Sequence, residues 1–290
     1  MSHDTQSAGS RLGSIGDRIG VVHLLASTLI LVVATILLGV ATKAAGAGLA
    51  CEANWPVCDG GLLNLFPANV PSFFEWIHRV VAMVAGFFIV GTAVAAWRGA
   101  VTDRRVVWAV TLGMVLTPIQ VLLGRETVLA YEMTVLNLHF WTAVVIFVLF
   151  AASAVLVSLD HLTLRHVRWS LGVGTILVPL QVLLSPLVID SYTPVIQTTQ
   201  YAFTLALLFA VIVAAIVGSH HATGRVGRGL VLSLPPLAVA LTYFGREAVM
   251  AFDPAVDLVY LGVTGLTFVA LLVGIWLVRP QSPVFTRSAQ

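Results

Sequence analysis

Charge and cysteine are scarce in this sequence. Only 10% of its 290 residues are charged, whereas 59% are hydrophobic, and Cys51 and Cys58 are its two cysteines. Soluble domains typically carry about 25% charged residues, so the composition excludes an ordinary soluble protein. Two cysteines alone do not complete a tetrahedral zinc site. The net charge of +2 is also small, and we predict no binding of nucleic acid.

Long apolar runs make up most of the chain. A membrane-spanning helix needs about 20 consecutive apolar residues, and eight such runs occur, at 21–42, 76–98, 104–124, 136–158, 168–188, 194–217, 229–245 and 256–278. The first run is too long for the apolar region of a signal peptide and is followed by seven more. The fold class that we predict is therefore an all-α integral membrane protein with eight transmembrane helices.

Lysine and arginine predict the orientation of these helices, because cytoplasmic loops of membrane proteins are rich in both. With a cytoplasmic N-terminus, eleven of the 15 Lys and Arg residues fall on the cytoplasmic side. The other four, Lys43, Arg79, Arg125 and Arg246, fall outside. We therefore predict a multi-pass protein of the plasma membrane with both termini in the cytoplasm.

The sequence repeats itself at a distance of 121 residues. The segment GRETVLAYEMTVLNLHF, Gly124–Phe140, resembles GREAVMAFDPAVDLVYL, Gly245–Leu261, without a gap. Four spans in each copy give both copies the same orientation, so a pseudo-two-fold axis along the membrane normal would relate two tandem four-helix bundles. We predict an N-terminal tail at 1–20, a first bundle at 21–158 with a long outer loop at 43–75, a second bundle at 159–278 and a C-terminal tail at 279–290.

Two histidines share one depth in the first bundle. His78 and His139 each lie within about one turn of the outer end of a predicted helix, and the two helices run in the same direction. Paired imidazoles are ligands of a six-coordinate haem iron, so we predict a haem site near the extracytoplasmic surface. The alternative is a hydrogen bond between helices. His23 lies roughly 25 Å deeper at 1.5 Å per residue and cannot share that iron. The other histidines lie in the tail or in cytoplasmic loops, at His3, His161, His166, His220 and His221.

Two charged residues flank His78. Glu75 lies three residues before it, on the same helical face, where a carboxylate could accept protons or stabilise positive charge on a substrate carbon. Arg79 could pair with a haem propionate. The alternatives are an interfacial carboxylate paired with Arg79 or Arg125, and an arginine that extends to the membrane surface.

The two cysteines lie in the long outer loop, in the segment CEANWPVC. That side of the membrane is oxidising, so a disulfide between Cys51 and Cys58 is plausible. It would serve either as a structural link or as a redox-active pair that passes electrons near the haem site.

These residues resemble the haem A synthase family, and the resemblance covers essentially the whole chain. GLACEANWPVC is similar to the family's first outer loop, EWIHR to its second-helix signature and NLHFW to its fourth-helix histidine segment. The resemblance implies oxidation of the C8 methyl group of haem O to a formyl group, which gives haem A for terminal oxidases. It also implies that His78 and His139 ligate the haem, that Glu75 assists catalysis, and that Cys51 and Cys58 are often disulfide-bonded.

The second copy departs from that family. Eight-span members usually carry a histidine in the sixth and in the eighth helix, which together hold a haem b cofactor. Here those places carry Gln200 and Tyr260, so we predict that the second bundle holds no bis-histidine haem. Electrons would then arrive through the cysteine pair, a transient partner or a neighbouring protomer.

Other functions would use the same residues differently. A b-type cytochrome that only carries electrons needs both histidines but not Glu75, and a membrane thiol oxidoreductase needs the cysteines but not His78. A transporter is disfavoured, because its polar residues should approach mid-membrane. The deeper Pro118, Gln120, Pro179 and Gln181 are most simply kinks and hydrogen bonds between helices. The ligands and partners that we predict are haem O and haem A, haem B as an alternative pigment, haem O synthase, an electron donor, the lipid bilayer and, in a homo-oligomer, a second copy.

Overall fold

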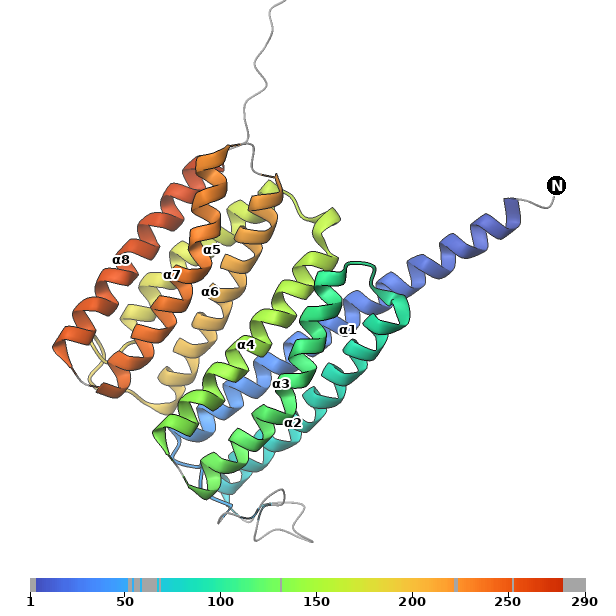
Figure 1. The fold of residues 1–290 in the computed structure, drawn as a ribbon. Coiled ribbons are helices and arrows are strands. Elements are labelled where there is room, and N and C mark those ends of the chain that lie inside the picture. Colours follow the sequence, from blue (N-terminus) through green and yellow to red (C-terminus); the bar gives the residue numbers. More distant parts are fainter. Residues whose placement is uncertain are drawn as a thin grey trace, which may run out of the picture. The chain divides into compact units, whose positions relative to one another are not determined.

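Eight long helices account for most of the chain in a computed structural model of the protein (Figure 1). The structure describes residues 4–51, 54, 58, 67, 69–130, 132–221, 224–251 and 253–278. The helices are α1 (Asp4–Ala44), α2 (Val70–Ala95), α3 (Arg104–Leu129), α4 (Met133–Val157), α5 (Leu164–Leu183), α6 (Pro194–His221), α7 (Arg225–Ala251) and α8 (Pro254–Leu277). Over these ranges no strand occurs, which confirms the all-helical prediction.

Seven of these helices are long and apolar enough to cross a membrane, with α1 counted from Gly20. The exception is α5, which has 20 residues and carries Arg165 and Arg168 near its start. It ends at Leu183, earlier than the predicted run of 168–188. Ser185 turns its side chain back to the Val182 carbonyl, at 2.7 Å, and the following proline has no N–H with which to continue the helix. The seven candidate spans support a multi-pass membrane protein.

Polar side chains cap the first turns of α2 and α3. Asn69 accepts a hydrogen bond from the Ser72 N–H at 2.8 Å, which caps α2. Asp103 accepts one from the Arg105 N–H at 2.9 Å, which caps α3. The side-chain hydrogen bond from Arg105 also lowers the pKa of Asp103. Such caps satisfy N–H groups that have no partner inside the helix. Between the two helices, Gly99 has φ 90°, a left-handed conformation that glycine adopts readily.

The chain divides into two compact units. Unit 1 comprises Met1–Asp160 with Ser191–Leu205, and unit 2 comprises His161–Asp190 with Ala206–Gln290. In unit 1, α1 packs against α2 and α4, and α3 packs against the same two helices. Helices α2 and α4 are therefore diagonal to one another across the interior of this four-helix bundle. In unit 2, α8 packs against α5 and α7.

Glycine allows close packing inside each unit. A Cβ on Gly113 of α3 would lie 2.6 Å from the Phe150 ring of α4, and Phe150 is fully buried. A Cβ on Gly174 of α5 would lie 3.2 Å from Leu271 of α8. Membrane helices associate through such contacts between small and large residues, because lipid provides no hydrophobic drive to bring them together.

Candidate functional site

The N-terminal end of α2 carries the charged residues that the sequence singled out. Glu75 is buried, with 7% of its surface exposed. Arg79, one turn further along, donates from Nε to Glu75 Oε1 at 2.9 Å. Of the two partners considered for this carboxylate, the structure selects Arg79, since Arg125 pairs with Glu126 at 2.6 Å. A buried carboxylate needs such a partner to remain charged.

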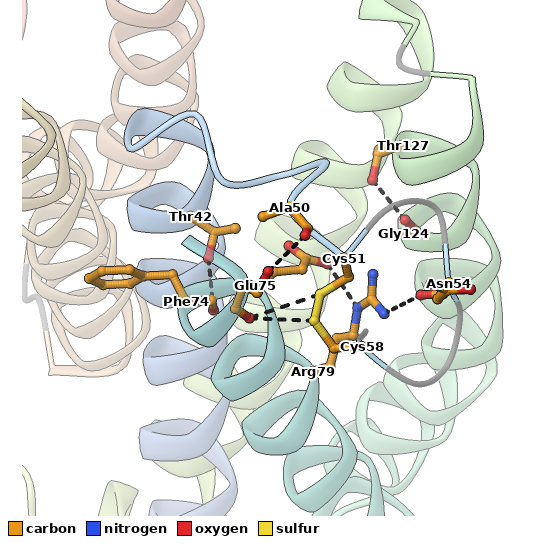
Figure 2. Close-up of polar contacts among 11 residues, drawn as sticks. Thr42, Ala50, Cys51, Asn54, Cys58, Phe74, Glu75, Arg79, Gly124 and Thr127 are labelled. Carbon is orange, nitrogen blue, oxygen red and sulfur yellow. Dashed lines mark hydrogen bonds and ion pairs between the residues drawn. A yellow bond between two sulfur atoms is a disulfide. The ribbon is translucent and has the colours of Figure 1, made fainter. Parts of the chain in front are cut away.

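Cys51, Asn54 and Cys58 lie beside the same end of α2 (Figure 2). Cys51 and Cys58 are joined by a disulfide, and both sulfur atoms lie within 3.9 Å of the Ser72 carbonyl oxygen. Ser72 donates through Oγ to the Ala50 carbonyl at 2.7 Å. Arg79 donates through Nη1 to the Asn54 carbonyl at 2.8 Å. The described parts of the loop are therefore attached to α2 at two points about two turns apart.

His78 lies against α1. A Cβ on Gly39 would approach the His78 ring to 2.9 Å, so the absence of a side chain at position 39 leaves the space that the imidazole occupies. The ring is in hydrogen-bond contact with the backbone of Thr35, also on α1. Its Nδ1 atom is buried and has no hydrogen-bond partner. A buried nitrogen without a partner is costly, and it is an atom that a bound metal can use.

His139 lies against α3 in the same manner. A Cβ on Gly124 would lie 3.0 Å from His139 Cε1. His139 Nδ1 lies 3.2 Å from the Gln120 carbonyl oxygen, and because a carbonyl can only accept, Nδ1 carries the proton. Nε2, which lies 3.4 Å from the Gln120 side-chain amide nitrogen, is then the acceptor. Metal-binding histidines commonly donate their other N–H to a backbone carbonyl in this way.

The two imidazoles belong to helices of one bundle. They come from diagonal helices, so they approach the interior from opposite sides. A pocket of about 70 Å³ lies nearby, and its lining includes Ala82, which is four residues after His78, and Ala143, four residues after His139. The buried Nδ1 of His78 and the unprotonated Nε2 of His139 are nitrogen atoms of the kind that ligate a haem iron.

Gln120 was missed as a site residue by the sequence reading, which assigned it to bonding between helices. It does bond between helices, but its partner is the candidate ligand His139, and it also lines the pocket. Its Oε1 atom is buried without a partner. Each histidine ring packs against a glycine of a neighbouring helix, His78 against Gly39 and His139 against Gly124. Both glycines are visible in the sequence, but their contacts are not.

The corresponding places of the second copy hold different side chains. In unit 2, Tyr260 is 2% exposed, and a Cβ on Gly245 would lie 3.0 Å from its ring. In unit 1, Gln200 is buried and accepts a hydrogen bond from the Tyr192 hydroxyl. Neither residue offers an imidazole nitrogen, and each has a place in the packing of its own unit.

Other histidines take part in other contacts or fall outside the described residues. His166 accepts from the Thr163 N–H at the start of α5, and His221 bonds to the Leu162 carbonyl at 3.0 Å. The rings of His220 and His221 contact edge to face, whereas His3 falls outside the described residues. Across the described ranges no group of three or more His, Cys, Asp and Glu side chains is gathered to hold a metal ion.

Known proteins that are similar to this chain carry names connected with haem or cytochrome oxidase. The model of the COX15-CtaA family, described as cytochrome oxidase assembly protein, matches residues 22–289. A protoheme IX farnesyltransferase of Halobacterium salinarum is 40% identical over 85 residues, which are 29% of this chain and 18% of that protein. Another, of Natronomonas pharaonis, is 37% identical over 103 residues, 36% of this chain and 20% of that protein.

A heme A synthase of Listeria monocytogenes is 25% identical over 115 residues, 39% of this chain and 36% of that protein. The chain therefore spans well under half the length of each of these relatives. No solved structure matches the chain.

Proposed function

The chain belongs to the COX15-CtaA family of cytochrome oxidase assembly proteins, and we propose that it is a haem A synthase-like membrane oxidoreductase. Its substrate would be haem O and its product haem A, with the C8 methyl group oxidised to a formyl group. The observation that carries this proposal is the pair of imidazoles in one bundle, with a buried carboxylate one turn from His78. The similarity to a heme A synthase supports it.

His78 and His139 would hold the iron of the substrate haem. The buried Nδ1 of His78 has no protein partner, and the hydrogen bond from His139 Nδ1 to the Gln120 carbonyl leaves Nε2 unprotonated. Both imidazoles are therefore neutral ligands whose orientation the neighbouring helices determine. The nearby pocket, lined in part by Ala82 and Ala143, gives room for an apolar part of the substrate.

Glu75 would accept a proton, or stabilise positive charge on the reacting carbon, during the oxidation. Conversion of a methyl to a formyl group takes up the oxygen of one water and releases four protons and four electrons. A buried carboxylate near the reacting carbon can accept a proton or stabilise positive charge there. Its ion pair with Arg79, at 2.9 Å, keeps it in one orientation. The electrons would leave the site for an electron-accepting redox protein, so electron transfer would run outward and not inward as the sequence suggested.

We propose that all eight helices span the membrane with both termini in the cytoplasm. Helix α5 has 20 residues, which at about 1.5 Å per residue give the roughly 30 Å of a bilayer core. It packs against α8, and Arg165 and Arg168 near its start are exposed, so we place them at the cytoplasmic surface of the membrane. Eleven of the 15 Lys and Arg then lie inside, and the haem site lies on the extracytoplasmic side of the plasma membrane.

Substrate supply would come from an enzyme that attaches a farnesyl group to haem. Two of the similar proteins are by name protoheme IX farnesyltransferases, and haem O is a farnesylated haem. A haem O synthase is therefore the partner that we propose on the substrate side. The rival role of a membrane thiol oxidoreductase is weakened by the structure, since Cys51 and Cys58 are 0% and 2% exposed and a reactive pair needs access.

Pigment analysis tests this proposal. The full chain is produced in membranes that also contain a haem O synthase, and the haem is extracted from the purified protein and identified by mass. We expect haem O and haem A. Haem B alone would identify an electron carrier and overturn the assignment.

A further inference from the structure

Arg79 hydrogen-bonds to two parts of the chain that are 21 positions apart in sequence, Asn54 and Glu75. Its Nε donates to Glu75 Oε1 at 2.9 Å, and its Nη1 donates to the Asn54 carbonyl at 2.8 Å. Figure 2 shows the guanidinium between these two acceptors. Asn54 lies within the segment that the Cys51–Cys58 disulfide closes. One side chain thus links the closed loop to the candidate catalytic carboxylate.

Both cysteines and Ala50 are held against α2 at Ser72. Both sulfur atoms lie against the Ser72 carbonyl, at 3.9 Å and 3.7 Å, and Ser72 Oγ donates to the Ala50 carbonyl at 2.7 Å. On the other flank, Thr42 of α1 donates to the Phe74 carbonyl at 3.1 Å. The disulfide limits how far the Asn54 carbonyl can move from this anchor. The position of that carbonyl therefore depends on the disulfide.

The chemistry of arginine suits this link. Its planar guanidinium presents several N–H donors in a rigid fork, so two acceptors on different sides fix the whole group. The bond to a carboxylate is charge-assisted and stronger than a neutral one. The side chains of Arg79 and Glu75 are 14% and 9% exposed, so water competes little for either. With the guanidinium fixed, one rotamer of Glu75 is favoured.

We infer that Arg79 is a positioning residue, which transmits the geometry of the disulfide-closed loop to Glu75. The inference deepens the proposed function and rests on it for the catalytic role of Glu75. It gives the buried disulfide a mechanical role in place of electron transfer. It also makes Glu75 the functional partner of Arg79, whereas the sequence suggested that Arg79 pairs with a haem propionate.

Arg125 provides a matched control. It lies near the outer end of α3 and also forms an ion pair with a glutamate, Glu126, at 2.6 Å. The side chains of that pair are 43% and 45% exposed, so its loss should change little. Arg125→Gln removes an arginine–carboxylate pair of the same chemistry without touching the link between Asn54 and Glu75.

The first experiment measures the accessibility of Glu75 and does not depend on haem. The full chain in membranes is treated with a hydrophobic carbodiimide, and the labelled fraction of Glu75 is followed by peptide mass mapping. In Arg79→Gln, and in the double variant Cys51→Ser/Cys58→Ser, we expect labelling about tenfold faster than in wild type, since the carboxylate is released from its ion pair. Arg125→Gln should label at the wild-type rate. Wild-type labelling of Glu75 in Arg79→Gln would overturn the inference, even if the protein converts haem O.

The second experiment measures turnover of haem O. Arg79→Gln should lower kcat about 10- to 100-fold, because a displaced catalytic group costs rate, and should leave KM within about threefold, because the histidines are untouched. Adding the cysteine substitutions to Arg79→Gln should cause no further loss, since both break one link. Arg79→Lys keeps the charge but not the fork, and should recover only part of the rate. A selective rise in KM, or losses that multiply, would contradict a positioning role. Failure of wild type to convert haem O would remove the proposed function and leave the labelling result to decide the link.

Discussion

Two corners of the molecule are built alike and carry different chemistry. In unit 1, a Cβ on Gly124 would lie 3.0 Å from His139, and in unit 2 a Cβ on Gly245 would lie 3.0 Å from Tyr260. In each, a glycine on one helix leaves space for a flat ring on the next, fifteen positions later in the sequence. Only the first ring offers a nitrogen ligand. The space for the ring and the ability to bind iron are therefore separable properties of this fold.

His139 and Tyr260 also differ in their surroundings. His139 hydrogen-bonds to Gln120 through both ring nitrogens and lies one helical turn from Ala143, which lines the pocket. Tyr260 is 2% exposed and fills its space as a large core side chain. A tyrosine in this position preserves packing, and the second unit thereby keeps its fold without the ligand.

The largest effect should come from exchanging the rings themselves. His78→Ala and His139→Ala should each lower bound haem more than about tenfold, because each removes an axial ligand. Tyr260→Ala should leave bound haem unchanged while it destabilises unit 2, since it opens a cavity. Haem per milligram of purified protein and the reduced-minus-oxidised spectrum measure this. Equal haem loss in Tyr260→Ala and His139→Ala would erase the difference between the two corners.

A smaller effect is expected at the charged residue before His78. Glu75→Gln removes the carboxylate but not its shape, so it should retain haem while conversion of haem O falls about 100-fold, within the range for general acid–base groups. The control is Gln197→Ala, which should convert normally. Gln197 lies 122 residues after Glu75, the shift that aligns this stretch of the two copies once one gap is allowed. Haem A formed per bound haem is the measure. A normal yield from Glu75→Gln would end its catalytic role.

The two glycines offer a matched pair of subtler changes. Gly124→Ala and Gly245→Ala each add one Cβ that meets a ring at 3.0 Å, so the ring must move by a few tenths of an ångström. Only the first shift reaches the hydrogen bond between His139 and Gln120, and a lost bond of this kind costs about tenfold in metal affinity. Haem titration of both variants would show it. If both retain wild-type affinity, the close contact at Gly124 does not orient the ligand.

The smallest effect is expected from removing one hydrogen bond between α1 and α2, which should change only stability. Thr28 and Thr92 are buried and share a hydrogen bond of 2.8 Å between α1 and α2. Thr28→Val should lower stability by about 0.6 kcal/mol, the average for such bonds in membranes, with haem conversion unchanged. Thr267→Val, which loses a bond to the Val263 carbonyl of its own helix, should cost less. Thermal unfolding in detergent compares the two.

Much of this arrangement was predictable from residue spacing. The apolar runs located the helix ends to within six residues, except that α1 begins 17 residues before its run. The three-residue step from Glu75 to His78 placed both near the N-terminal end of α2. The 121-residue repeat predicted that Tyr260 would stand where His139 stands. These features depend on local periodicity, which the sequence carries directly.

Other features depend on how helices rotate against one another, and the sequence does not encode that in any single stretch. Gln120 is 19 positions from His139, and Asn54 is 25 positions from Arg79, yet each pair is in contact. Helix α5 ends at Leu183 because of the local turn at Ser185. Apolar composition alone extends the predicted run to 188 and does not detect this turn. Cross-helix partners of this kind follow from packing and not from pattern.

The most direct test of the central claim is the amount and identity of haem in the purified wild-type protein. The account predicts one haem per chain, farnesylated, held by His78 and His139 with none in the second unit. Two haems per chain, or a single haem B, would contradict it.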